Sequence, residues 1–302
     1  MIYNIGIISL LSNNQIKKQI FKLITILLIT FVIVNLSGVV HAVTLQGNIY
    51  KTSGKKYSAR HWIKNGQSKY SRAKYERAVK AFKNSIACYP DYFEAWDGLG
   101  NALYCIGSYD AAIQAYDKAL DVKPDSNPTK VNKGIALYKK GNCEKALKIF
   151  DEAIKAEPKL SSTLYNKGVV LISVGRYSEA IAVFDKAIEL NPQDELSWCG
   201  KGYILILLEG YEEALKFFAK AVSNNPNRGW AWNNMGITLD RLRMYDEAIK
   251  AFDKALEINP KNARAWHNKA NTLYNIGKYD ESMKIYSKAA ELDPFLYAGV
   301  KK

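Results

Sequence analysis

Residues 93–124, FEAWDGLGNALYCIGSYDAAIQAYDKALDVKP, contain two apolar stripes of helical period, one on each side of Gly107-Ser108. The first stripe consists of Trp96, Leu99, Gly100 and Leu103, and the second of Ala112, Ile113, Tyr116, Ala119 and Leu120. Pro124 follows the second stripe, and proline cannot extend a helix. The stretch therefore predicts two helices joined by a tight turn.

The same pattern recurs along the chain with a period of 34 residues. Seven of the eight prolines lie on this period, at Pro90, Pro124, Pro158, Pro192, Pro226, Pro260 and Pro294. A small residue recurs in the first stripe at Gly66, Gly100, Gly134, Gly168, Gly202, Gly236 and Ala270, and an aromatic ring in the second at Phe82, Tyr116, Phe150, Phe184, Phe218, Phe252 and Tyr286. Such a period predicts helix pairs that bury their apolar faces on the neighbouring pairs.

At these residues, and at the periodic tryptophans Trp62, Trp96, Trp198, Trp232 and Trp266, the chain resembles the tetratricopeptide repeat (TPR) family. Lys130 and Leu164 replace the tryptophan in two repeats. The resemblance implies an all-α, right-handed α-solenoid of seven 34-residue helix-turn-helix repeats. The predicted repeats are 59–92, 93–126, 127–160, 161–194, 195–228, 229–262 and 263–296, followed by a short tail, 297–302.

Residues 1–42 precede the repeats and carry an uncharged apolar run from Leu23 to Val40 behind Lys17, Lys18 and Lys22. This arrangement is typical of a signal peptide cleaved after Ala42. An uncleaved transmembrane helix is an equal alternative, because the run approaches the roughly 20 residues that cross a bilayer. We expect an extracytoplasmic protein, secreted or membrane-anchored, with a cytoplasmic-facing anchor as the alternative. Residues 43–58 are predicted to form a basic linker.

The net charge of +14 is distributed unevenly, since residues 43–92 contribute +9 and residues 93–302 only +2. The basic segment includes Lys55, Lys56, Lys69, Arg72, Lys74, Arg77, Lys80 and Lys83. We expect residues 1–92 to contact an anionic membrane surface, with an ordinary solvated surface as the alternative. Nucleic acid is not an expected partner, because export would remove the chain from it.

The residue types that catalysis and metal binding require are not grouped in this sequence. His61 and His267 lie in distant repeats, and the four cysteines fall at four different positions of the period. The sequence has no glycine-rich phosphate-binding loop that follows a strand. We therefore predict no enzymatic activity, no metal site and no cofactor.

The resemblance also implies that the exposed face of each first helix lines a concave groove. In repeats three to five this face is apolar, with Val131, Ile135, Tyr138, Tyr165, Val169, Ile172, Leu196, Tyr203, Ile206 and Leu207. In repeats six and seven it is more polar, with Trp230, Asn233, Arg241, Arg264, His267 and Asn271. A large exposed apolar patch marks an interaction site, and a peptide with hydrophobic anchors would fit it. The alternative is that the apolar side chains are partly buried within the chain.

The expected function is that of a protein-protein interaction scaffold that binds a protein or peptide partner in the groove. Two alternatives remain: a self-assembling structural or surface component, and a cytosolic-facing, membrane-anchored regulatory module. The short tail after Pro294 motivates the first alternative, because it leaves no full capping helix over Met283, Tyr286 and Ala290. A homo-oligomer would then form through the C-terminal repeat.

Overall fold

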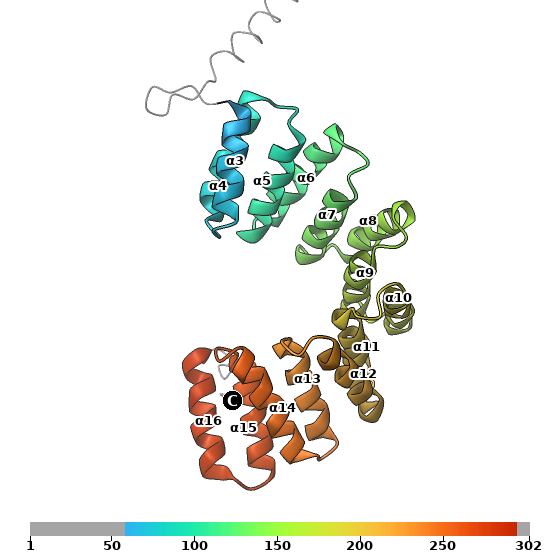
Figure 1. Ribbon diagram of the computed structural model, residues 1–302, viewed down its shortest axis with the longest axis vertical. Coiled ribbons are helices and arrows are strands. Elements are labelled where there is room, and N and C mark those ends of the chain that lie inside the picture. The colour runs from blue at the N-terminus through green and yellow to red at the C-terminus, as the bar shows by residue number, and fades with distance from the viewer. Residues whose placement is uncertain (1–57, 295–302) are drawn as a thin grey trace, which may run out of the picture. The chain divides into compact units, whose positions relative to one another are not determined.

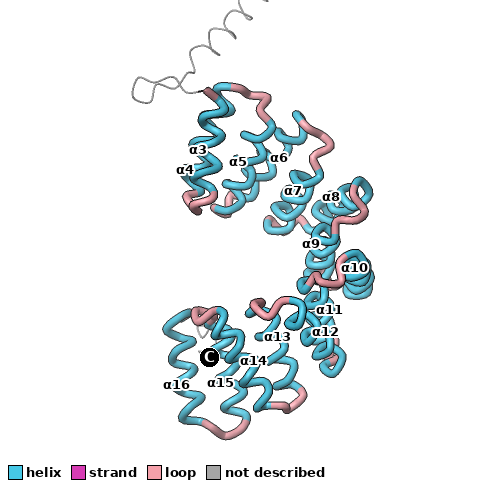
Figure 2. Tube along the Cα trace, in the orientation of Figure 1, coloured by secondary structure: helices cyan, strands magenta, loops and turns pink. Residues whose placement is uncertain are grey.

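The computed structural model describes residues 58–294, which form 14 α-helices and contain no strand (Figures 1 and 2). The helices are α3 (Ala59–Tyr70), α4 (Tyr75–Cys88), α5 (Phe93–Cys105), α6 (Tyr109–Val122), α7 (Asn127–Lys139), α8 (Cys143–Ala156), α9 (Ser161–Ser173), α10 (Tyr177–Leu190), α11 (Glu195–Leu207), α12 (Tyr211–Asn224), α13 (Gly229–Arg241), α14 (Tyr245–Ile258), α15 (Ala263–Asn275) and α16 (Tyr279–Leu292). Two by two they correspond to the seven predicted repeats, which confirms the all-α prediction.

The predicted leader, nearly all of the basic linker and the tail lie outside the described residues. Between Ser58 and Pro294 no helix combines the length and the apolar character that crossing a bilayer requires.

The chain divides into two compact units, one ending at Gly107 and the other beginning at Ser108. In the first, α4 packs on α3 and α5, and α3 also touches α5. In the second, each helix from α6 to α16 packs on its neighbours in the sequence. The first helices of successive repeats also touch one another there, α7 with α9, α9 with α11, α11 with α13, and α13 with α15. Equivalent positions on these helices therefore lie side by side.

The core of each repeat is an aromatic ring held between small residues. Phe184 of α10 is completely buried, and a Cβ atom on Gly168 or Gly200 would lie 2.5 Å from its ring. Only glycine fits at both positions, which explains why the small residue and the ring recur together. The equivalent rings in the first six repeats are all buried, whereas Tyr286 in the seventh is half-buried.

The periodic tryptophans are less buried than a core position requires, and the structure gives them a second role. In four of the five, the half-buried indole Nε1 donates a hydrogen bond to the carbonyl of the proline six residues earlier. The pairs are Trp96 with Pro90 (2.6 Å), Trp198 with Pro192 (2.9 Å), Trp232 with Pro226 (2.8 Å) and Trp266 with Pro260 (2.9 Å). Tryptophan and proline thus share one period because the indole ties the loop between repeats to the helix that follows.

Replacing Trp198 by phenylalanine should lower the free energy of unfolding by about 1 kcal/mol, because the ring keeps much of its apolar contact but loses the hydrogen bond. Urea unfolding followed by circular dichroism measures the change. Trp230→Phe is the control, since Trp230 lies off this period and is 44% exposed, and we expect it to change stability by less than about 0.5 kcal/mol. Equal losses in the two variants would contradict the role given to the indole N–H.

Candidate functional site

Side chains of α11, α13 and α15 line a pocket of about 840 Å³ in the second compact unit. These are the first helices of repeats five to seven, and they lie side by side. Five of the predicted groove residues meet here, namely Tyr203, Trp230, Asn233, Arg264 and His267. The pocket therefore brings together aromatic, amide and cationic groups from three successive repeats.

One wall of the pocket is aromatic. The rings of Tyr203 and Trp230 lie with their centroids 6.4 Å apart at an angle of 47°. The side chain of Asn234 donates to the backbone carbonyl of Trp230 at 2.9 Å, which steadies the first turn of α13. Because Trp230 remains 44% exposed, its ring offers apolar area that a bound residue can cover.

Asparagine amides form a second part of the lining. Asn268 Nδ2 donates to Asn233 Oδ1 at 3.1 Å, and Asn233 itself is only 8% exposed. Asn262 Oδ1 accepts from the backbone N–H of Ala265 at 3.3 Å and so caps α15. An amide side chain presents both a donor and an acceptor, which is what the backbone of an extended peptide requires. The sequence analysis missed Asn234 and Asn268, although both occupy one position of the period, two residues before the small residue of the first helix.

The charged and ionisable groups of the lining are few. Arg264 is exposed at the start of α15, and Asp293 lies at the end of α16. Burial lowers the pKa of His267, so its imidazole is neutral at neutral pH. This ring also stands edge-on to that of Tyr286, with the centroids 5.5 Å apart. Arg264 therefore supplies the positive charge of the pocket at neutral pH.

The predicted apolar groove residues are mostly half-buried. Val131, Ile135, Tyr138, Tyr165 and Ile172 pack against the core cluster that contains Phe150 and Phe184, and Tyr203 and Ile206 pack against the next cluster. Val169 and Leu196 are half-buried as well, whereas Leu207 is 42% exposed. One side of each of these half-buried side chains packs against the core, and the other side remains accessible. The alternative, partial burial within the chain, therefore describes most of the predicted apolar groove residues.

Two further predicted residues are not among those that line the pocket. Arg241 is exposed at the end of α13. Asn271 Oδ1 accepts a hydrogen bond from the hydroxyl of Tyr286. These two therefore do not share the pocket with Trp230.

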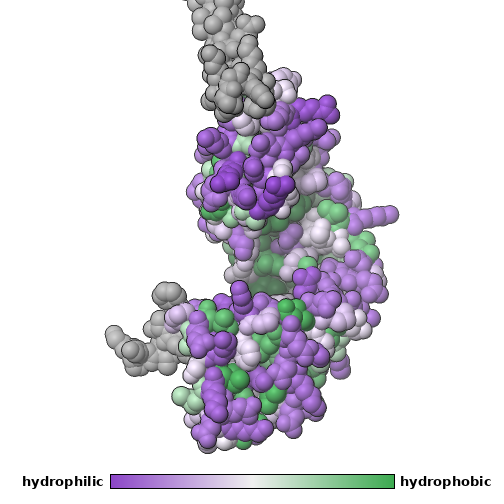
Figure 3. Space-filling model, turned by 60° about the vertical axis from the view of Figure 1, so that its left-hand side comes forward, coloured by the Kyte–Doolittle hydropathy of each residue, from purple (hydrophilic) through white to green (hydrophobic). Residues whose placement is uncertain are grey.

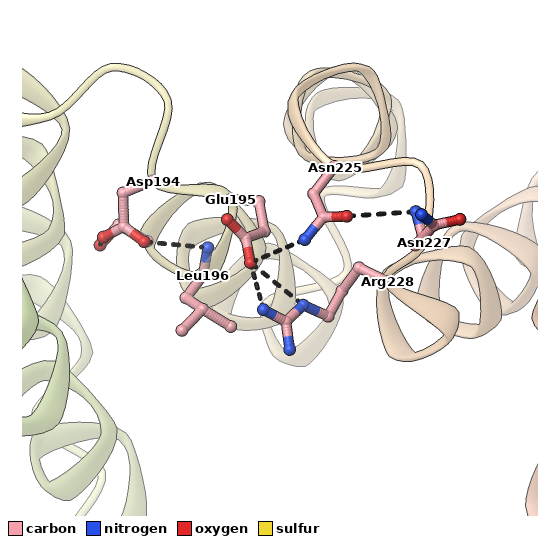
Figure 4. A network of polar contacts seen from close by, with 7 residues as sticks. Asp194, Glu195, Leu196, Asn225, Asn227 and Arg228 are labelled. Atoms are coloured by element: carbon pink, nitrogen blue, oxygen red, sulfur yellow. Dashed lines mark hydrogen bonds and ion pairs between the residues drawn. The ribbon is translucent and has the colours of Figure 1, made fainter. Parts of the chain in front are cut away.

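A polar network at the start of α11 was also missed by the sequence analysis (Figure 4). Glu195 Oε1 accepts from Arg228 Nε at 3.1 Å, from Arg228 Nη2 and from Asn225 Nδ2 at 3.2 Å. Burial opposes ionisation of Glu195, but these hydrogen bonds outweigh it and hold the pKa of the carboxyl below its ordinary value. The network fixes the loop between α12 and α13, which leads directly to Trp230.

The described residues contain no group of three or more histidine, cysteine or acidic side chains that could hold a metal ion. Burial raises the pKa of Cys199 to about 12, so this thiol stays protonated and is not a nucleophile at neutral pH.

Comparison with known proteins identifies the repeats. Tetratricopeptide repeats match residues 63–127, 131–195, 165–228, 229–262 and 251–284. Comparison with curated proteins gave no significant match.

Solved structures share the fold at low sequence identity. A tetratricopeptide repeat protein from Parabacteroides merdae is 17% identical, with 78% of this chain and 93% of that chain covered and a TM-score of 0.64. A chain of the APC/C hetero-tetramer Cut9–Hcn1 is 16% identical, with coverages of 76% and 45% and a TM-score of 0.65. Pseudomonas aeruginosa PilF is 20% identical, with coverages of 67% and 92% and a TM-score of 0.58. The matched repeats and the shared fold show that this chain belongs to the tetratricopeptide repeat family.

Proposed function

We propose that the chain is a protein-binding scaffold that holds an extended peptide segment of its partner in the pocket formed by α11, α13 and α15. The observation that carries this proposal is the exposed ring of Trp230 beside a row of asparagine amides. An apolar anchor residue of the peptide would cover Trp230 and Tyr203, while Asn234 and Asn268 would pair with its backbone. Arg264 would bind a carboxylate of the peptide. This function involves no chemical step.

The half-buried apolar side chains of α7, α9 and α11 extend the same surface towards the N-terminus of the second compact unit. Because the first helices lie side by side, a peptide anchored at Trp230 would continue along Tyr203 and Tyr165. Figure 3 shows hydrophobic residues among hydrophilic ones over α13–α16, in the lower part of the view. Alternation of this kind suits a segment with spaced hydrophobic anchors.

The experiment selects peptides that bind the full chain from a random library displayed on phage. A selected synthetic peptide is then titrated into Trp230→Ala and Tyr203→Ser. We expect each variant to weaken binding about 30-fold, the equivalent of about 2 kcal/mol for a hot-spot residue. The control is Tyr279→Ser, because Tyr279 lies on α16 outside the pocket and is 57% exposed. Unchanged affinity in both pocket variants, with an unchanged circular dichroism spectrum, would refute the proposal.

We also propose that the repeats lie outside the cytoplasm and that the basic segment contacts an anionic membrane. Arg72, Lys74, Arg77, Lys80 and Lys83 are all exposed, and hydrophilic residues cover the part of Figure 3 where α3 and α4 lie. Each basic residue near an anionic bilayer contributes about 1 kcal/mol. Protease added to intact cells should cleave the repeats, whereas full protection would favour the cytoplasmic-facing anchor.

Self-association is a second candidate function, favoured by the exposed apolar side chains of the last repeat. Tyr274 is 55% and Met283 63% exposed. A dimer that covers them should be detected by light scattering at rising protein concentration and should be lost in Met283→Glu. A monomer at all concentrations would exclude this candidate.

A further inference from the structure

The first compact unit carries basic side chains that take no part in the ion pairs of the fold. Residues 58–92 contain two acids and eight lysines and arginines, which are Arg60, Lys64, Lys69, Arg72, Lys74, Arg77, Lys80 and Lys83. Every ion pair among residues 58–294 lies beyond residue 108, so none of the eight is paired with an acid there. In the second unit, by contrast, Lys201 Nζ lies 2.5 Å from Asp185 Oδ1. The positive charge of the first unit is therefore available to a partner.

Three of these side chains gather where α3 is joined to α4. Arg72 and Lys74 lie in the connecting turn and Arg77 in the first turn of α4, and all three are exposed. A cation is unfavourable at the N-terminus of a helix, because the helix dipole is positive there. At the position of Arg77 four other repeats carry glutamate, namely Glu179, Glu213, Glu247 and Glu281. Arg77 thus opposes the stability of its own helix, which indicates a role outside the fold.

Apolar side chains are exposed at the same end of the unit. Tyr70, the last residue of α3, and Ile106, which follows α5, are each 36% exposed. They lie near one another, because the hydroxyl of Tyr70 is 3.5 Å from Sγ of Cys105. The ring of Tyr70 also stands edge-on to that of Tyr75, with the centroids 5.4 Å apart. One end of the unit therefore combines cationic and apolar groups in a surface, termed the basic tip, that consists of Tyr70, Arg72, Lys74, Arg77 and Ile106.

The other end of the same unit provides a comparison for the basic tip. α3 and α4 are antiparallel (Figure 1), and Ser85 Oγ near the end of α4 donates to the carbonyl of Ala59 at the start of α3, at 2.9 Å. Three further exposed basic residues lie in the first half of α3 or beside Ser85, namely Arg60, Lys64 and Lys83. These three carry the same total charge as Arg72, Lys74 and Arg77 but lie away from the basic tip.

We propose that the basic tip docks on the surface of an anionic lipid bilayer. This inference rests on the membrane contact proposed above and names the part of the unit that makes it. The three cations would bind the phosphates of lipid headgroups, while Tyr70 and Ile106 would enter the boundary between headgroups and acyl chains. Charge complementarity favours this partner, because the cations of the basic tip form no ion pair among the described residues.

The test measures binding of the full chain to lipid vesicles by sedimentation. The anionic vesicles contain about 30% phosphatidylglycerol in phosphatidylcholine, and the neutral vesicles contain phosphatidylcholine alone. We expect the natural chain to bind the anionic vesicles at least about tenfold more tightly. Residues 1–42 are the same in every variant, so any binding that they contribute cancels from the comparison. Equal binding to both kinds of vesicle would refute the proposed membrane contact and the docking of the basic tip with it.

Matched charge variants locate the contact within the unit. The combination of Arg72→Gln, Lys74→Gln and Arg77→Gln should weaken binding to the anionic vesicles at least about 30-fold. The control combines Arg60→Gln, Lys64→Gln and Lys83→Gln, which removes the same charge from exposed positions, and should weaken binding no more than about threefold. Equal losses in the two combinations would overturn the docking of the basic tip and leave the broader membrane contact standing.

An apolar variant tests whether the basic tip enters the bilayer. Ile106→Ser should weaken binding to the anionic vesicles about threefold, because a docked tip buries this side chain. Val122→Ser is the control, since Val122 at the end of α6 is 39% exposed and lies outside the basic tip. An Ile106→Ser variant that binds as tightly as the natural chain would overturn the proposal. Tight binding of a single-stranded oligonucleotide without any preference for anionic vesicles would also overturn it, in favour of a nucleic acid partner.

Discussion

Phe184→Ala should lower the free energy of unfolding by about 3–5 kcal/mol. The ring is completely buried between α9 and α11, and its removal leaves a cavity that two glycine-bearing helices cannot easily close. Phe217→Ala is the matched control, because Phe217 is half-buried and should cost about half as much or less. Urea unfolding followed by circular dichroism measures both, and equal losses would contradict the central role of the buried ring.

A double-mutant cycle with Gly200→Ala tests the clamp on that ring. Alanine gains about 1 kcal/mol over glycine inside a helix, whereas forcing a Cβ atom against a packed ring costs about 1–3 kcal/mol. The substitution should therefore destabilise the natural chain by up to about 2 kcal/mol. In the Phe184→Ala background the ring is gone, so the same substitution should be neutral or stabilising. An identical effect in both backgrounds would show that something other than Phe184 excludes a side chain at residue 200.

The repeats could be predicted because each buried contact recurs with the period. Large rings and small residues alternate in phase over seven repeats, and only a stack of helix pairs gives every one of them an equivalent partner. The indole–proline hydrogen bond was not predicted, although both residues lie on the period. A period shows that two residues are coupled, but it does not distinguish a core contact from a hydrogen bond to a loop.

The candidate site could be predicted in outline only. The period indicates which helix face is shared, so Trp230, Arg264 and His267 were assigned to one surface, and all three line the same pocket. Exposure depends on neighbours one repeat away, and for this reason Asn233 is buried under Asn268. Glu195 and Arg228 are 33 residues apart and occur as a pair in one repeat, so no periodic signal marked them.

Arg228→Ala should lower the free energy of unfolding by about 2–3 kcal/mol at neutral pH. The side chain of Glu195 is 15% exposed, and without Arg228 its charge stays largely desolvated and unpaired. The matched control is Arg176→Ala, whose partner Glu179 is 55% exposed, and there we expect less than about 1 kcal/mol. Glu195→Gln in the Arg228→Ala background should recover part of the loss, because it removes the unpaired charge.

The pH dependence gives a sharper test of the same pair. Because the pKa of Glu195 is lowered in the folded chain, the stability that its ionisation contributes is fully present above the ordinary glutamate pKa of about 4.3. It is lost as the pH falls through the lower, folded-state pKa. The difference in unfolding free energy between the natural chain and Arg228→Ala should therefore be largest near pH 7 and shrink below about pH 4. A difference that does not change with pH would mean that Arg228 stabilises the loop through packing of its aliphatic stem, since packing, unlike an ion pair, does not require Glu195 to be charged.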